Sequence, residues 1–174
     1  SRMTPTPFDR VFGKSLAVTC IRLGPTFIKL GQLLATRPDL VGEEVADELR
    51  ILFDRIPPIS IKKIETILRR ELGKKVVQKE IQWIDPKPLG SASLAQTHRA
   101  KLSDGRPVIL KIQKEGVAEL VRLDVKLLKG IAQSVNLIYP KLGILKIFRD
   151  FEEATLREVD YREEAKNIDD EVKE

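Results

Sequence analysis

Apolar residues recur at helical spacing through the first 72 residues of the chain. Helix-breaking pairs interrupt this pattern, among them Gly24-Pro25 and Pro57-Pro58. Ser60 is a suitable N-terminal cap for the stretch that follows it, and Gly73 ends that stretch. The pattern predicts four helices: Phe8–Arg22, Thr26–Arg37, Glu43–Asp54 and Ile61–Leu72.

The pattern of apolar residues changes after Gly73, where β-branched residues and turn residues become frequent. The sequence predicts two extended segments, a tight turn and a further strand: Lys79–Trp83, Leu89–Leu102, Ser103–Arg106 and Pro107–Gln113. Two long helical patterns follow, at Val117–Leu137 and Leu145–Val172. This order predicts an α+β fold, in which a small antiparallel sheet with helices follows a helical extension.

The composition suits a folded chain, because 42% of the residues are hydrophobic. A single cysteine excludes an intramolecular disulfide, so we expect the cytoplasm or the interior of an organelle. No apolar run is long enough to cross a membrane, so we expect no transmembrane segment.

Charge is distributed unevenly along the chain. Residues 150–174 have a net charge of −7, whereas residues 1–149 have a net charge of +12. A basic body could bind nucleic acid, anionic lipid or nucleotide phosphates. Aromatic residues make up only 5% of the chain and do not alternate with the basic ones, so we expect no nucleic-acid partner.

A run of small residues precedes the strand that carries Lys111. The run consists of Gly90, Ser91, Ala92, Ser93, Leu94 and Ala95. Its spacing is that of a protein-kinase phosphate loop, G-x-G-x-x-G, with Ala92 and Ala95 at the second and third glycine positions. Small residues let backbone N–H groups approach phosphate oxygens, and a lysine on the next strand can reach the same phosphates. The alternative is an ordinary hairpin of small residues.

Lys111 strengthens the nucleotide interpretation. Strand alternation places it on one face with Ile109 and Gln113, inside an otherwise apolar run. A lysine in such a strand usually has a charged partner.

A second group of polar residues lies on the predicted helix Thr26–Arg37. Lys29, Gln32 and Thr36 share a narrow polar stripe on an otherwise apolar helix. The stripe is either the solvent edge of the helix or a polar face docked against another site. Gly31 favours docking, because a glycine inside a helix costs about 1 kcal/mol relative to alanine and is most useful where another backbone packs closely.

A third group lies on the last predicted helix. On a helical wheel, Glu158 falls at the centre of the apolar stripe, so we expect it to meet a cation. Asp160 and Glu164 are four residues apart and form a separate acidic ridge, for which a solvated charged face is the alternative.

Together these groups resemble, from about residue 20 to 168, the UbiB family of atypical kinases, which includes the aarF-domain-containing kinases and is linked to ubiquinone biosynthesis. The family's K-x-G-Q motif matches Lys29, Gly31 and Gln32, and its E-x-D motif matches Glu158 and Asp160. Its alanine-containing loop, strand lysine and helix glutamate match residues 90–96, Lys111 and Glu164.

The resemblance implies a kinase-like N-lobe at residues 74–174, preceded by a helical extension at residues 1–73 that carries K-x-G-Q and covers the nucleotide pocket. It implies ATP or ADP with Mg²⁺ as cofactors, a location peripheral to a membrane in the intact protein, and quinone-type or anionic lipids and quinone-biosynthesis proteins as partners. It also implies that Lys111 pairs with Glu164. The opposed charges on two apolar helices further predict that Lys29 and Gln32 turn toward Glu158 and Asp160. The oligomeric state is not indicated.

One departure from the family is large. The chain has no H-R-D-like or D-F-G sequence, so the family's catalytic-loop and metal-binding residues have no counterpart. We therefore expect no catalytic and no metal-binding residue in this chain, and no ATP turnover by it alone. The alternative function is a non-catalytic scaffold whose basic helices contact a partner or an anionic membrane. Its contacts would be Lys62, Lys63, Arg69, Arg70, Lys74 and Lys75.

Overall fold

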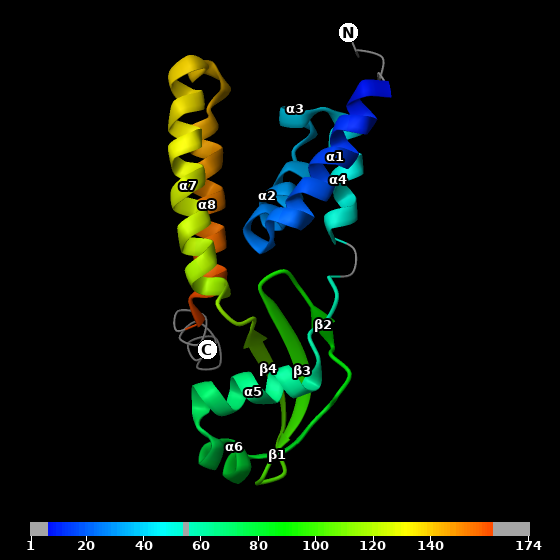
Figure 1. The fold of residues 1–174 in the computed structure, drawn as a ribbon, viewed down its shortest axis with the longest axis vertical. Coiled ribbons are helices and arrows are strands. Elements are labelled where there is room, and N and C mark those ends of the chain that lie inside the picture. The colour runs from blue at the N-terminus through cyan, green and yellow to red at the C-terminus, as the bar shows by residue number, and fades with distance from the viewer. Residues whose placement is uncertain (1–6, 54–55, 162–174) are drawn as a thin grey trace, which may run out of the picture. The chain divides into compact units, whose positions relative to one another are not determined.

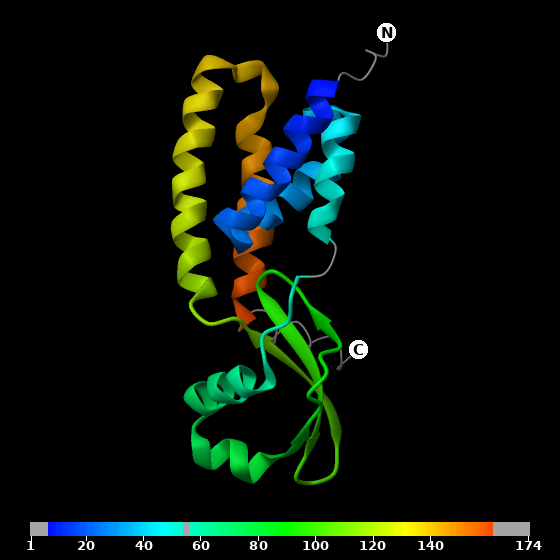
Figure 2. The ribbon, with the colours of Figure 1, turned by 45° about the vertical axis from the view of Figure 1, so that its right-hand side comes forward.

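The computed structural model describes residues 7–53 and 56–161, which form two compact units (Figures 1 and 2). The first unit contains the described residues up to 53 together with those from 116 onward. The second unit contains residues 56–115. Each unit has its own cluster of buried hydrophobic residues.

The first unit is entirely helical. Its elements are α1 (Pro7–Leu23), α2 (Pro25–Ala35), α3 (Pro38–Val41), α4 (Glu43–Leu49), η1 (Arg50–Phe53), α7 (Val117–Ile138), η2 (Pro140–Leu142) and α8 (Ile144–Val159). Helices α7 and α8 run side by side and are joined at one end by η2 (Figure 1). Helix α2 contacts α1 and α4 as well as α7 and α8, so it connects the two parts of this unit.

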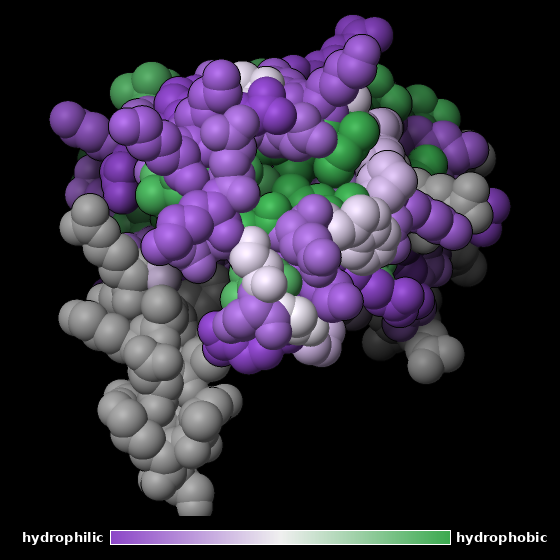
Figure 3. All heavy atoms as spheres, turned by 90° about the horizontal axis from the view of Figure 1, so that it is seen from below, coloured by the Kyte–Doolittle hydropathy of each residue, from purple (hydrophilic) through white to green (hydrophobic). Residues whose placement is uncertain are grey.

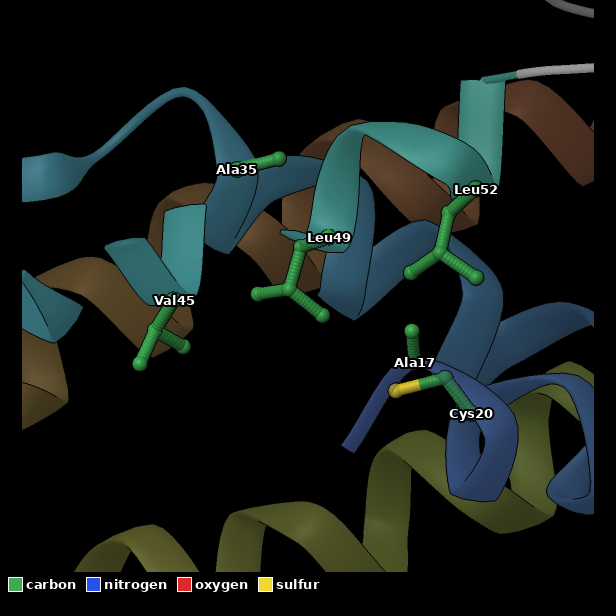
Figure 4. Packing of buried hydrophobic residues seen from close by; sticks show 6 residues of the cluster. All are labelled: Ala17, Cys20, Ala35, Val45, Leu49 and Leu52. Atoms are coloured by element: carbon green, nitrogen blue, oxygen red, sulfur yellow. The ribbon is translucent and has the colours of Figure 1, made fainter. Parts of the chain in front are cut away.

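Small side chains allow the first four helices to pack closely. The buried cluster contains Ala17, Cys20, Ala35, Val45, Leu49 and Leu52, which come from α1, α2, α4 and η1 (Figure 4). Ala17 and Cys20 lie one turn apart on α1, so that they share one face. Burial of these groups is the main stabilising contribution to this part of the chain.

The α7–α8 pair is held by a regular apolar stripe on each helix. Buried residues recur three to seven positions apart, at Val117, Val121, Val125 and Ala132 on α7 and at Phe148, Phe151, Thr155 and Val159 on α8. This spacing places each set on one face of its helix.

The second unit contains the antiparallel sheet. Its elements are α5 (Ile61–Leu72), α6 (Lys74–Glu80), β1 (Ile81–Ile84), β2 (Gly90–Ser91), β3 (Ala95–Leu102) and β4 (Pro107–Gln113). Strand β3 is central, with β4 along one edge. On its other edge β1 pairs with the end of β3 and β2 with its beginning.

One face of the sheet packs on α5. Ile64, Ile67 and Leu68 of α5 form a buried cluster with Ile112 of β4. The predicted small antiparallel sheet with helices, typical of a kinase-like N-lobe, is therefore confirmed.

Seen from below, the surface of the molecule is mostly hydrophilic and surrounds a smaller hydrophobic patch (Figure 3).

Several predicted elements agree closely with the structure. The bounds of α5 and β4 are those predicted, and α1, α2 and α7 differ from prediction by two residues or fewer at each end. The predicted helix Glu43–Asp54 is α4 followed by the 3₁₀ turn η1. Ser60 occupies the N-cap position of α5, but its side chain makes no capping hydrogen bond.

Two predicted elements were wrong in extent, and a third is interrupted. The segment Lys79–Trp83 begins as helix, because α6 continues to Glu80 before β1 starts. The segment Leu89–Leu102 is broken between β2 and β3, where the chain turns. The predicted helix Leu145–Val172 is interrupted at Asp160, which has φ −100 and ψ 84, and its remainder from residue 162 lies outside the described residues. No glycine or proline marks the interruption, so apolar spacing alone did not reveal it.

The compact units differ from the predicted division at residue 73. Helix α5 packs on the sheet, whereas α7 and α8 pack with α2. The physical reason is that the apolar face of α5 matches the apolar face of β4, a long-range relationship that order along the chain does not reveal.

Candidate functional site

Lys29 joins helix α2 to helix α8. Its Nζ donates a hydrogen bond to Oε1 of Glu158, as predicted from the opposed charges on two apolar helices. The side chains are 27% and 45% exposed, so the pair is partly solvated. The predicted contact is confirmed, but the prediction that the pair is buried was wrong.

The position of Glu158 on α8 explains its exposure. The buried stripe runs through Phe148, Phe151, Thr155 and Val159, and Glu158 flanks this stripe instead of lying at its centre. Ala154, an apolar residue on the other flank of Glu158, is exposed. The wheel weighted all apolar residues equally, whereas the two Phe side chains determine which face of α8 is buried.

Gly31 lies where no larger residue fits. A Cβ atom at this position would lie 2.3 Å from Cδ1 of Leu52 and 3.2 Å from Sγ of Cys20. Both neighbours are themselves buried in the core of the first unit. The glycine therefore allows side chains of α1 and η1 to approach α2. The neighbours are side chains of the predicted helical extension and not the backbone of a docked site, so the prediction of close packing holds but its partner was wrong.

Gln32 also holds η1 against α2. Its Nε2 donates a hydrogen bond of 2.9 Å to the carbonyl oxygen of Leu52. The prediction that Gln32 turns toward Glu158 and Asp160 is therefore wrong. The carbonyl of Leu52 lies in a 3₁₀ turn, where backbone acceptors are often left without a helical partner, and the amide supplies one.

A further contact of α2 was missed from the sequence. The fully buried Thr26 donates a hydrogen bond of 2.7 Å from Oγ1 to Oδ2 of Asp124 on α7. Asp124 is an acidic residue within an apolar helical pattern, and that departure from the pattern was the available signal. Helix α2 is thus tied by polar contacts to η1, α7 and α8.

Asp160 and Glu164 were predicted to form an acidic ridge on one helix. Asp160 is the C-cap of α8 and is not helical, so the predicted uninterrupted helix does not include it. Glu164 lies outside the described residues. The pairing of Glu164 with Lys111 therefore stays a prediction.

The small-residue loop forms a tight turn between β2 and β3. The N–H of Ala92 donates a hydrogen bond of 2.8 Å to the carbonyl of Ala95. Ser93, Leu94 and Ala95 are buried, Ser91 is half-buried, and Gly90 and Ala92 are exposed. In this conformation, Gly90 and Ala92 are the loop residues most open to a ligand.

The sheet register brings the start of this loop into line with Lys111. Gly90 of β2 pairs with Thr97 of β3, and Thr97 pairs with Lys111 of β4. Neighbouring strands lie about 4.8 Å apart, so these three residues form a row across the sheet. Lys111 is exposed and lies on the sheet face opposite to Ile112, which packs on α5.

A buried polar network lies beside the loop and was also missed. Gln96 Oε1 accepts a hydrogen bond of 2.9 Å from the N–H of Ile59, and Gln96 Nε2 donates to the carbonyl of Ile59 at 3.1 Å. Gln96 Nε2 lies 2.8 Å from Nε2 of His98, and Nδ1 of His98 lies 2.7 Å from the carbonyl of Asp85.

This geometry assigns the histidine tautomer. A carbonyl oxygen only accepts, so Nδ1 of His98 carries the proton and Nε2 accepts from the Gln96 amide. His98 is therefore a fully buried, hydrogen-bonded residue of the sheet. Gln96, which directly follows the loop, connects the sheet to the segment before α5.

Cys20 is a buried residue in the core of the first unit. Burial raises the pKa of its thiol, because the thiolate would lose its hydration. This environment favours the unreactive thiol and argues against a nucleophile.

Within residues 7–53 and 56–161, no group of three or more His, Cys, Asp or Glu residues could hold a metal ion. Nor does any helix in this part of the chain combine the length and the apolar character needed to cross a membrane.

The chain is similar to several curated kinase-like proteins. A probable protein kinase UbiB of Pseudomonas fluorescens is 36% identical over 164 residues, which make up 92% of this chain and 30% of that protein. An aarF domain-containing protein kinase of Arabidopsis thaliana chloroplasts is 34% identical over 152 residues, or 85% of this chain and 28% of that protein. The solved structure of Rv3197 with erythromycin, from Mycobacterium tuberculosis, is 30% identical with a TM-score of 0.42, and the match covers 77% of this chain and 33% of that one.

The chain spans about a third or less of the length of these curated relatives. The model of the ABC1 atypical kinase-like domain matches residues 51–174, which is more than half of the chain. The resemblance inferred from the K-x-G-Q, loop, lysine and E-x-D motifs is thereby confirmed. The chain belongs to the ABC1 atypical kinase-like family.

Proposed function

We propose that this chain provides the nucleotide-binding part of an atypical kinase or ATPase that supports the synthesis of an isoprenoid quinone. The observation that carries the proposal is the row formed by Gly90, Thr97 and Lys111 across the sheet. A phosphate chain lying along this row would meet the exposed backbone of the loop at one end and the Lys111 ammonium at the other.

The residues that are present suit a nucleoside di- or triphosphate. Gly90 and Ala92 have little or no side chain to hold a phosphate away from the backbone, and both are exposed. Lys111 supplies a positive charge from a rigid strand, which holds its Cα in place. Mg²⁺ would neutralise phosphate charge when bound, and its ligands are expected outside this chain.

The support for a quinone-related role comes from family membership, because one relative is named UbiB. Quinone-type or anionic lipids and quinone-biosynthesis proteins are the partners that this role would require. A location at a membrane surface would follow from such partners and belongs to the same proposal.

The alternative, a non-catalytic scaffold, depended on the basic residues of α5 and α6. Three of them form ion pairs within the chain, since Arg69 pairs with Glu65, Arg70 pairs with Glu71 and Glu115, and Lys63 pairs with Glu115. Partly neutralised residues attract an anionic partner less strongly. These pairs favour the solvated helix face over a docking surface.

The proposal is tested by nucleotide binding to the full-length protein that contains this chain. Lys111→Met should weaken the affinity for ATP by about tenfold or more, because a hydrogen bond to a charged group is lost. Lys101→Met is the matched control, since Lys101 lies on β3 on the same face and is exposed. Equal ATP affinities of the two variants in calorimetric titrations would remove Lys111 from the site.

A further inference from the structure

The helical unit contains an apolar pocket that the nucleotide proposal does not use. It has a volume of about 320 Å³ and lies between α2 and α3 on one side and α7, η2 and α8 on the other. Every residue that lines it is Leu, Ile, Val, Ala or Phe. None of these residues belongs to the loop or to the strand that carries Lys111.

The lining determines what the pocket can hold. Sites for polar ligands include a few hydrogen-bonding groups that fix the ligand's orientation, and no lining side chain here can form a hydrogen bond. A nucleotide, sugar or peptide backbone would lose its hydration without compensation. Apolar cavities of about 150 Å³ already bind small hydrocarbons. The pocket is therefore suited to hydrocarbon.

The volume distinguishes a hydrocarbon chain from a partner helix. An α-helix with its side chains is about 10 Å across, so a space of 320 Å³ would hold less than one turn of it. A methylene group needs roughly the volume of a water molecule, about 30 Å³, so the same space holds a chain of about ten carbon atoms. A single hydrocarbon chain fits inside this space, whereas a helix could insert only a few of its side chains.

One side of the pocket is open to solvent. Ile131 on α7 lines the pocket and is 52% exposed, and Leu142 on η2 is also exposed. The interior is formed by residues such as Ala132, Phe148 and Phe151, which are buried. A polar headgroup can therefore remain in water at the rim while the chain enters between the helices.

We propose that the pocket between α2 and the α7–α8 pair binds one hydrocarbon chain of about ten carbons, or the end of a longer one. The headgroup is not selected, because the lining side chains offer no polar contact to it. This binding is independent of the nucleotide proposal, so either can fail alone.

Calorimetric titration with decanoate and with 1-decanol, below the concentrations at which they aggregate, tests the proposal on the full-length protein. Both should bind once per chain with a negative heat-capacity change, and butyrate should not bind measurably. Phosphatidylcholine vesicles form a second arm. Competition by vesicles would indicate a chain presented by a membrane, and its absence would indicate a free ligand; both agree with the pocket.

Variants on α7 locate the site. Ile131→Lys places a charge at the apolar rim and should weaken decanol binding by about tenfold. Leu127→Lys is the matched control, because Leu127 lies one turn away, is 62% exposed and does not line the pocket. The affinity of this variant for decanol should stay within about twofold of that of the unchanged protein. Ala132→Phe fills the interior and should abolish binding, provided that its melting curve shows a folded chain.

Two outcomes would overturn the proposal. One is the absence of saturable binding of decanol to the unchanged protein. The other is an equal loss of affinity in Ile131→Lys and Leu127→Lys, which would place the ligand on the exposed face of α7 and not in the pocket. If Ala132→Phe does not fold, the comparison of the two lysine variants still decides, since both substitutions are at exposed positions.

Discussion

Lys29 on α2 and Glu158 on α8 form an ion pair across 129 residues of sequence, and each belongs to a motif that had been recognised separately. The pair is partly solvated, so its contribution is smaller than that of a buried pair. It fixes the relative position of two helices whose apolar faces already pack together, and its main effect is on register.

Removing this pair should have a small but measurable effect. Lys29→Met should lower the free energy of unfolding by at most about 1 kcal/mol, because the lysine is only partly desolvated. Combining it with Glu158→Gln should cost less than the sum of the single changes, since both remove the same contact. Urea denaturation followed by far-UV circular dichroism measures all three variants. Lys62→Met, at an exposed position of α5, is the control and should leave the midpoint unchanged.

Additive effects of Lys29→Met and Glu158→Gln would contradict the pairing in solution. In that case, the K-x-G-Q lysine would contribute to stability through its aliphatic stem alone.

Gly31 and Gly130 provide a matched comparison of two glycines inside helices. Gly31→Ala should destabilise the chain by about 1–3 kcal/mol, because its Cβ would collide with the buried side chain of Leu52. Gly130→Ala should stabilise it by up to about 1 kcal/mol, since nothing lies within 4 Å of a Cβ there and alanine favours helix. Thermal melts of the two variants should therefore shift in opposite directions.

A rescue variant separates steric conflict from helix propensity. Adding Leu52→Ala to Gly31→Ala should cost less than the sum of the two single changes, because the shorter side chain removes the collision. If the double variant is as unstable as the two single losses added together, the close contact between Gly31 and Leu52 is not the cause.

The loop offers two substitutions with opposite effects on backbone freedom. Gly90→Ala should weaken nucleotide binding and leave the melting temperature unchanged, because its Cβ would lie 3.5 Å from Oγ1 of Thr97, an ordinary contact. Ala92→Gly should alter the preference between ATP and ADP, since a freer loop can close differently over the phosphates. The full-length protein is titrated with each nucleotide. Unchanged affinities in both variants would exclude the loop from the nucleotide site.

Stability at alkaline pH should depend on Cys20. Burial raises its thiol pKa, so the folded state favours the protonated form. The corresponding stabilisation is complete below the usual thiol pKa of about 8.5 and is lost as the pH rises through the raised folded-state pKa. Urea midpoints should therefore fall less steeply with pH, above about pH 8.5, in Cys20→Ala than in the unchanged chain. Parallel curves would contradict this role of the thiol.

Local patterns predicted most of the elements and one of the polar contacts between helices, Lys29 with Glu158. Apolar spacing was sufficient for α5 and β4, whose bounds match, because each has one face buried against the other. It did not reveal the interruption at Asp160 after α8, which no breaker residue marks. It also misplaced Glu158, because the wheel could not show that Phe148 and Phe151 determine the buried face.

Among the polar contacts, too, some could be predicted from the sequence and others could not. Opposite charges on two apolar helices made the pairing of Lys29 with Glu158 predictable, since each needed a partner. A neutral side chain that bonds to backbone carries no such signal, so the contacts of Gln32 with Leu52 and of Gln96 with Ile59 were not predicted. Such contacts depend on where a turn brings a carbonyl, which only the folded chain determines.

The buried amide of Gln96 is expected to be the most sensitive polar group in the sheet. Gln96→Leu keeps the size of the side chain but leaves the N–H and carbonyl of Ile59 and Nε2 of His98 without the partner they have now. Each buried polar group that loses its partner costs about 1–3 kcal/mol, and some will find water instead, so a total loss of about 2–4 kcal/mol is expected. Gln82→Leu, at an exposed position of β1, should change the urea midpoint little.

The loss of the Gln96 amide should also weaken ATP binding in the full-length protein. Gln96 pairs with Ser91 across β2 and β3, so its loss should loosen the loop, even though the amide itself faces the interior. A Gln96→Leu variant with an unchanged midpoint would mean that water replaces the amide at no cost. A variant that melts early but binds ATP normally would separate the network from the nucleotide site.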